Sequence, residues 1–150
     1  MFDLCFFQFT DLMDDLAKAL ADYHDPHTDP VRKQHLHEQL NRFLIDRNSW
    51  VIALRAFQQQ QQQSQTIVLS PLLFYFLLQV LEHSIRHHYG DQQQIRQILF
   101  WIFLQLYDSL PVYIRSKICF LIVKIVRCDI QWSIDEYFQT CYHVRSVFIL

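Results

Sequence analysis

Two histidines have a spacing that could hold a metal ion. His83 and His87 lie four residues apart, which places both on one face of a helix. A zinc protease motif would have glutamate directly after the first histidine, but Ser84 stands there, and no third ligand is near in the sequence. His35 and His37 point to different faces. We interpret these histidines as solvated helix-end residues and expect no metal site and no cofactor.

The motifs of common enzyme classes are absent. The sequence has no G-x-S-x-G elbow, P-loop or dinucleotide fingerprint. One glycine in 150 residues can hardly build a phosphate-binding loop. The carboxylates cluster near the N-terminus, where we expect exposure rather than catalysis. We predict that the chain is not an enzyme.

Charge is unevenly distributed, although the net charge of -2 does not suggest a nucleic-acid-binding protein. Residues 1–29 hold seven aspartates and one lysine, whereas residues 30–128 hold eleven lysines and arginines against five acids. Near the C-terminal end, four basic residues lie off the apolar stripe of a predicted helix: Arg115, Lys117, Lys124 and Arg127. They form either a solvated face or a contact face for an acidic partner.

Cysteine use and hydropathy place the chain among intracellular proteins without membrane insertion. Four cysteines, at positions 5, 119, 128 and 141, form no C-x-x-C pair, and we expect them to be reduced. The N-terminus lacks the basic segment of a signal peptide. The longest apolar runs, Leu72 to Leu78 and Ile98 to Leu104, are far shorter than the ~20 residues of a membrane span.

The basic set belongs to the most regular stretch, Pro111 to Phe138. Its apolar residues recur at helical spacing: Ile114, Ile118, Leu121, Ile122 and Ile125. Ser109 is the expected N-cap and Pro111 the expected first-turn residue. We expect this helix to end near Cys128 and the next to begin at Trp132.

The remaining helices are predicted from apolar periodicity and capping residues. We expect them at about 3–23, at 30–46 after a Thr28 or Asp29 cap, from Asn48 or Ser49, from Ser70-Pro71 to a Gly90 C-cap, and from an Asp91 cap. Gln58 to Gln63 either extends the third helix into solvent or forms a loop. The core of the fifth helix is expected to include Phe103, and its neighbours Phe100, Trp101 and Tyr107 are also interpreted as core residues.

Helix starts recur with a period of about forty residues. Pro30, Pro71 and Pro111 are 41 and 40 residues apart, and Ser49, Asp91 and Trp132 are 42 and 41 apart. Two helices per repeat of this length are typical of HEAT or armadillo arrays. We therefore predict an all-α HEAT solenoid with repeats at 3–46, 49–89, 91–129 and a partial one at 132–150, and a Gln-rich insertion at 58–65. The apolar C-terminal end predicts the front portion of a longer superhelix.

Three segments resemble one protein superfamily. They are RKQHLHEQLNRFLIDRNSW, VLEHSIRHHY and SLPVYIRSKICFLIVKIVRCD, and the resemblance as a whole covers about Leu16 to Phe138. The third is similar to the inner helix of the third repeat in the importin-beta/exportin (karyopherin) superfamily, with its pattern of LP, an aromatic, I-R-x-K and I-V-x-I. The other two resemble the inner helices of the first two repeats.

This resemblance implies a nuclear transport receptor that shuttles between nucleus and cytoplasm. Its partners would be the small GTPase Ran in its GTP form, nuclear pore proteins and a protein cargo. The exportin branch that the chain resembles most carries actin with profilin. Inner helices would face Ran, and helix geometry then places eight residues there: Gln39, Arg42, Gln79, Glu82, Arg86, Lys117, Lys124 and Arg127. The alternative is a HEAT scaffold that binds other proteins independently of nucleotide.

Overall fold

The computed structural model describes residues 2–63, 67–128 and 139, and throughout them the regular structure is helical, without a strand. This confirms the all-α prediction. The helix expected from Trp132 and the partial repeat at 132–150 fall outside the described residues. None of the helices described is both long and apolar enough to cross a membrane. The chain divides into two compact units, Met1–Gly90 and Asp91–Leu150.

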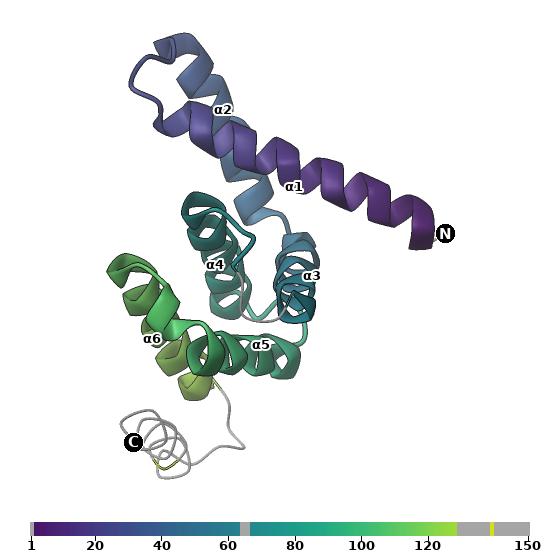
Figure 1. Ribbon diagram of the computed structural model, residues 1–150, viewed down its shortest axis with the longest axis vertical. Coiled ribbons are helices and arrows are strands. Elements are labelled where there is room, and N and C mark those ends of the chain that lie inside the picture. The colour runs from purple at the N-terminus through teal and green to yellow at the C-terminus, as the bar shows by residue number, and fades with distance from the viewer. Residues whose placement is uncertain (1, 64–66, 129–138, 140–150) are drawn as a thin grey trace. The chain divides into compact units, whose positions relative to one another are not determined.

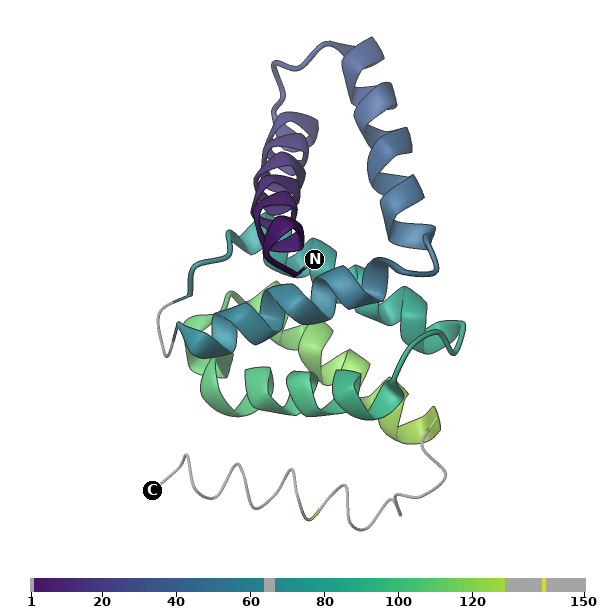
Figure 2. The same cartoon turned by 90° about the vertical axis from the view of Figure 1, so that its right-hand side faces the viewer.

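The first unit contains two helical hairpins. Its elements are α1 (Phe2–His24), α2 (Pro30–Ile45), α3 (Ser49–Gln62) and α4 (Pro71–Arg86). Helix α1 packs on α2 and α3 packs on α4, while α4 also contacts both α1 and α2 (Figures 1 and 2). The starts of these four helices and the ends of α1 and α2 agree with the prediction to within one or two residues, which is the usual uncertainty of a helix end.

Helix α4 forms the centre of this unit because apolar side chains surround most of it. Phe74 is completely buried and meets Phe57 of α3 edge to face, with ring centroids 5.0 Å apart. Phe76 faces Phe43 of α2 at 5.9 Å. Aromatic pairs at such separations add to the free energy of burial. The N-terminus of α4 is capped as predicted, since the Ser70 hydroxyl accepts a hydrogen bond from the backbone N–H of Leu73.

The glutamine run is helical as far as Gln62, so the first of the two predicted alternatives holds. It does not lie wholly in solvent, however. Gln60 is only 2% exposed, and its side-chain oxygen accepts a hydrogen bond from the backbone N–H of Val68 at 2.9 Å. A buried amide needs such partners because leaving polar atoms unsatisfied is costly. The tract thereby ties α3 to the segment that leads into α4.

The end of α4 corrects the prediction of a Gly90 cap. The left-handed residue after this helix is His88, with φ 59°. The N–H of Tyr89 donates to the carbonyl of Ser84 at 2.9 Å and the N–H of His88 donates to that of Ile85, which is the hydrogen-bond pattern of a Schellman motif. In addition, the Ser84 hydroxyl donates to the carbonyl of Tyr89 at 2.6 Å. The helix therefore stops before the glycine is reached.

Gly90 has a different role. Its φ is +78°, and a Cβ added there would overlap the indole ring of Trp50, 2.5 Å from Cε2. Glycine is required because the backbone passes against the ring in a conformation that L-residues rarely adopt. The contact fixes the end of the second hairpin to the start of α3.

The second unit comprises α5 (Gln92–Gln105), the short 3₁₀ helix η1 (Tyr107–Ser109) and α6 (Val112–Cys128), with α5 packed on α6. The Asp91 cap is confirmed, because its carboxylate accepts from the N–H groups of Gln93 and Gln94. All five apolar residues of the predicted α6 stripe are buried. The four aromatic residues interpreted as core, Phe100, Trp101, Phe103 and Tyr107, are instead only partly buried.

The start of α6 also differs from the prediction. Ser109 lies inside η1 rather than at an N-cap, and Pro111 precedes the helix, whose first residue is Val112. Two buried leucines, Leu106 and Leu110, flank this 3₁₀ turn. Burial of both side chains favours the tight turn that includes Ser109. The carbonyl of Pro111 then accepts the first helical hydrogen bonds, from Ile114 and Arg115.

Candidate functional site

Helix α6 has a face that carries cations and aromatic rings, of which Tyr113, Phe120 and Arg127 are exposed and Lys117 and Lys124 are half-buried. Its members are spaced four, three, four and three residues apart, and therefore lie on one side of the helix: Tyr113, Lys117, Phe120, Lys124 and Arg127. We call this set the cationic-aromatic face. The buried stripe that begins at Ile114 and Ile118 lies on another side of the helix.

Phe120 is the centre of this face. Its side chain is 47% exposed, unusual for a residue of its size. The Nζ atoms of Lys117 and Lys124 lie 5.5 and 4.9 Å from the centroid of its ring, one turn before and one turn after it. Both ammonium groups are within cation–π range. The ring and the two lysines thus form one preorganised cluster.

The chemistry of the cationic-aromatic face suits an acidic protein surface. Helix α6 contains no acidic residue. Tyr113 and Val123 are also exposed, so apolar side chains lie among the cations of this helix. Aromatic and cationic side chains together are characteristic of protein–protein contacts. The three cations were predicted from the sequence, whereas both aromatic residues of the face were missed, although their spacing from the lysines is visible there.

Arg115 is a structural residue and does not belong to this face. Its Nε donates to the carbonyl of Leu110 at 2.7 Å, and its Nη2 donates to that of Asp108 at 3.1 Å. The guanidinium also lies over the ring of Tyr107, 5.3 Å from its centroid. Arg115 therefore satisfies carbonyls of the turn before α6, a role that its place in the sequence did not indicate.

The predicted contact residues of α2 and α4 differ in accessibility. Arg42 is exposed on α2, as is Gln39, which hydrogen-bonds through its amide to the His35 ring at 3.2 Å. On α4, Arg86 is exposed and pairs with Glu82 at 3.1 Å. The Glu82 side chain is only 15% exposed, and Gln79, one turn earlier, is half-buried. Accessibility therefore favours Gln39, Arg42 and Arg86 as contact residues over the other two.

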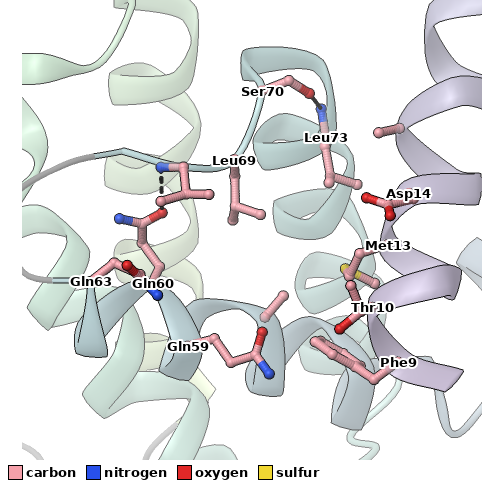
Figure 3. A pocket seen from close by; sticks show the side chains of 13 residues that line it. Phe9, Thr10, Met13, Asp14, Gln59, Gln60, Gln63, Leu69, Ser70 and Leu73 are labelled. Atoms are coloured by element: carbon pink, nitrogen blue, oxygen red, sulfur yellow. Dashed lines mark hydrogen bonds between the residues drawn. The ribbon is translucent and has the colours of Figure 1, made fainter. Parts of the chain in front are cut away.

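A pocket of about 310 Å³ lies in the first unit between α1, α3 and the segment that leads into α4 (Figure 3). Apolar side chains form much of its lining, and Asp14, Thr10 and the tract amides of Gln59 and Gln63 border it. The volume is in the lower range of small-ligand sites. None of the eight predicted contact residues lines it.

A cluster of histidine and tyrosine rings lies at the C-terminal end of α4. The rings of His83 and His87 are 4.2 Å apart by their centroids, and His87 stacks on Tyr89 at 5.7 Å. Arg47, from the turn between α2 and α3, lies over the tyrosine ring of this cluster, 5.4 Å from the Tyr89 centroid. Burial is the largest cause that lowers the pKa of His83, and the nearby charges of His87 and Arg86 lower it further.

Among residues 2–63, 67–128 and 139, no three histidine, cysteine or carboxylate side chains gather in a way that would hold a metal ion. Within the same ranges neither Cys119 nor Cys128 is in a disulfide, and Cys128 is exposed. The side chain of Cys5 and residue Cys141 lie outside the description. A closed metal centre therefore has no candidate in the described part of the chain.

Comparison with known proteins gives no relative from which a function could be transferred: no family model, curated protein or solved structure matches the chain.

Proposed function

We propose that the chain is the N-terminal part of a HEAT-repeat solenoid of the importin-beta/exportin superfamily and that it binds Ran in its GTP form during nuclear export. The resemblance of SLPVYIRSKICFLIVKIVRCD is closest to exportin-6, whose cargo is actin with profilin. The observation that carries the proposal is the cationic-aromatic face of α6, because that helix contains the most specific segment of the resemblance.

The pairing of helices supports this proposal. The contacts join α1 to α2, α3 to α4 and α5 to α6, and the second helix of every pair begins at or directly after one of the spaced prolines. In HEAT arrays the second helices line the concave surface, which is where these arrays bind partners. Helices α2, α4 and α6 hold the same position in their pairs here.

The α6 face is the strongest of the candidate contacts. Lys117 and Lys124 flank the exposed ring of Phe120, and Arg127 lies on the same side of the helix. An arrangement of this kind supports both electrostatic attraction and burial of apolar surface. In the first unit, Arg42 of α2 and Arg86 of α4 are separate exposed cations. Glu82, largely buried and paired, acts through Arg86 rather than by direct contact.

A binding titration against Ran tests the proposal. The full chain is immobilised and titrated with Ran loaded with a GTP analogue or with GDP. We expect selective binding of the GTP form. Lys117→Glu and Lys124→Glu should each weaken it by about five- to tenfold, since reversing a charge at an interface replaces an attraction with a repulsion.

Lys18→Glu is the matched control, because Lys18 is an exposed lysine of α1 outside all three second helices. Its effect should be less than about twofold, as for other exposed charges away from a contact. Equal affinity for the two nucleotide forms would contradict the transport proposal. Nucleotide-independent capture of another protein would favour a HEAT scaffold instead.

A further inference from the structure

His83 and His87 are the only histidines of the chain that are four residues apart. His83 lies in the last turn of α4, and His87 is the residue that caps this helix. Their ring centroids are 4.2 Å apart, so the two imidazoles lie side by side at the helix end. His83 is partly buried and His87 is exposed, so solvent reaches the pair.

His83 and His87 present their rings side by side within one turn of α4, at an i, i+4 spacing that puts both side chains on one helix face. A neutral imidazole binds a metal ion through one ring nitrogen.

We propose that His83 and His87 together chelate one divalent transition-metal ion of the class that prefers imidazole, such as Cu²⁺ or Zn²⁺. Metal–nitrogen bonds of about 2.0–2.1 Å bring two ligating nitrogens to within roughly 3–3.5 Å of one another, which adjacent rings on one helix face can reach by small side-chain rotations. Water completes the coordination sphere, since the described residues offer no third protein ligand nearby. The site is therefore an open two-ligand chelate and not a closed structural centre.

Neighbouring cations affect the affinity of this site. Two cations weaken the binding of a second positive charge: Arg86 is on the same helix turn, and Arg47 lies over Tyr89 beside His87. We therefore expect an exchangeable site whose affinity rises when Arg86 is replaced by glutamine.

The experiment is a titration of the full chain with CuCl₂, followed by electron paramagnetic resonance, and with ZnCl₂ in competition with a chromophoric chelator. All samples contain Cys128→Ser, because Cys128 is an exposed thiol that would itself bind these metals. The expected result is one equivalent of bound Cu²⁺ whose spectrum shows hyperfine coupling to two imidazole nitrogens. His83→Asn and His87→Asn should each weaken binding by about tenfold or more, since the second bond of a chelate forms at high effective concentration.

His88→Asn is the matched control. His88 is exposed on the same turn, and asparagine tolerates its left-handed backbone. This variant should keep the affinity of the parent chain to within about twofold, as for a residue that donates no ligand. Far-UV circular dichroism of every variant checks that α4 remains helical. Folded variants at position 83 or 87 that bind the metal as tightly as the parent, or a spectrum with one nitrogen or none, would overturn the chelate.

Discussion

Replacing the one glycine of the chain tests how the first unit is held together. A methyl group at Gly90 would overlap the Trp50 indole, and the backbone there has a φ of +78°. A left-handed L-residue costs about 1–2 kcal/mol. Overpacking a filled site costs a further ~1–3 kcal/mol. We expect Gly90→Ala to lower the free energy of unfolding by about 2–5 kcal/mol, a large share of the roughly 5–15 kcal/mol typical of a folded protein.

Urea unfolding followed by far-UV circular dichroism measures this loss. A double-mutant cycle separates its two causes, because Trp50→Leu removes the ring but leaves the backbone conformation of Gly90 unchanged. In that background Gly90→Ala should cost only the left-handed share, about 1–2 kcal/mol. Equal costs in both backgrounds would refute the steric argument. A cost below about 1 kcal/mol in the parent chain would refute the backbone argument as well.

The first unit supports three other predictions. His88→Gly should raise the free energy of unfolding by up to about 1 kcal/mol in urea, because glycine adopts a φ of 59° without strain but gains more entropy on unfolding. Gln60→Leu should lower it by about 1–3 kcal/mol by leaving the N–H of Val68 without an acceptor, whereas Gln61→Leu, at an exposed position of the same tract, should change it by less than about 0.5 kcal/mol. The pKa of the His83 ring is below 6.5 in the folded chain, so the unfolded chain binds a proton at this ring at a higher pH than the folded chain does. The free energy of unfolding should therefore fall as the pH drops below 6.5. Urea titrations at several pH values should show a smaller fall for His83→Gln.

Helix positions were predictable because local sequence determines them. The α6 stripe from Ile114 to Ile125 repeats at the spacing of a helix, so its buried side could be identified before any packing was known. The caps at Ser70 and Asp91 were predictable for the same reason, since a side chain near a helix start satisfies N–H groups only two or three residues away.

Features that depend on contacts between distant residues were not predictable. The sequence suggested Gly90 as the end of α4, but Ser84 and Tyr89 close the helix earlier, and the glycine is required by Trp50, forty residues away. Ser109 had a suitable residue type for a cap, yet burial of the leucines around it selected a 3₁₀ turn. In both cases tertiary packing overrides the local capping preference of the residue, because packing contributes more free energy.

Some residues of the candidate site could likewise be predicted from the sequence, and others could not. Lys117, Lys124 and Arg127 could be assigned to a polar side of α6 from the sequence, because every basic residue lay off the apolar stripe. The same reasoning grouped Arg115 with them, although it bonds to carbonyls of the preceding turn. The exposure of Phe120 could not be foreseen, since an aromatic residue in a helix is more often buried.

Gln60 is the third residue of the glutamine run, counted from its N-terminal end. Runs of one repeated codon gain copies when DNA replication slips. Helix α3 starts at Ser49, and its register is set from that end, so added glutamines leave residues 49 to 60 unchanged. A length increase in this gene segment would therefore keep glutamine at position 60, whereas a single point substitution at that codon would remove the buried amide.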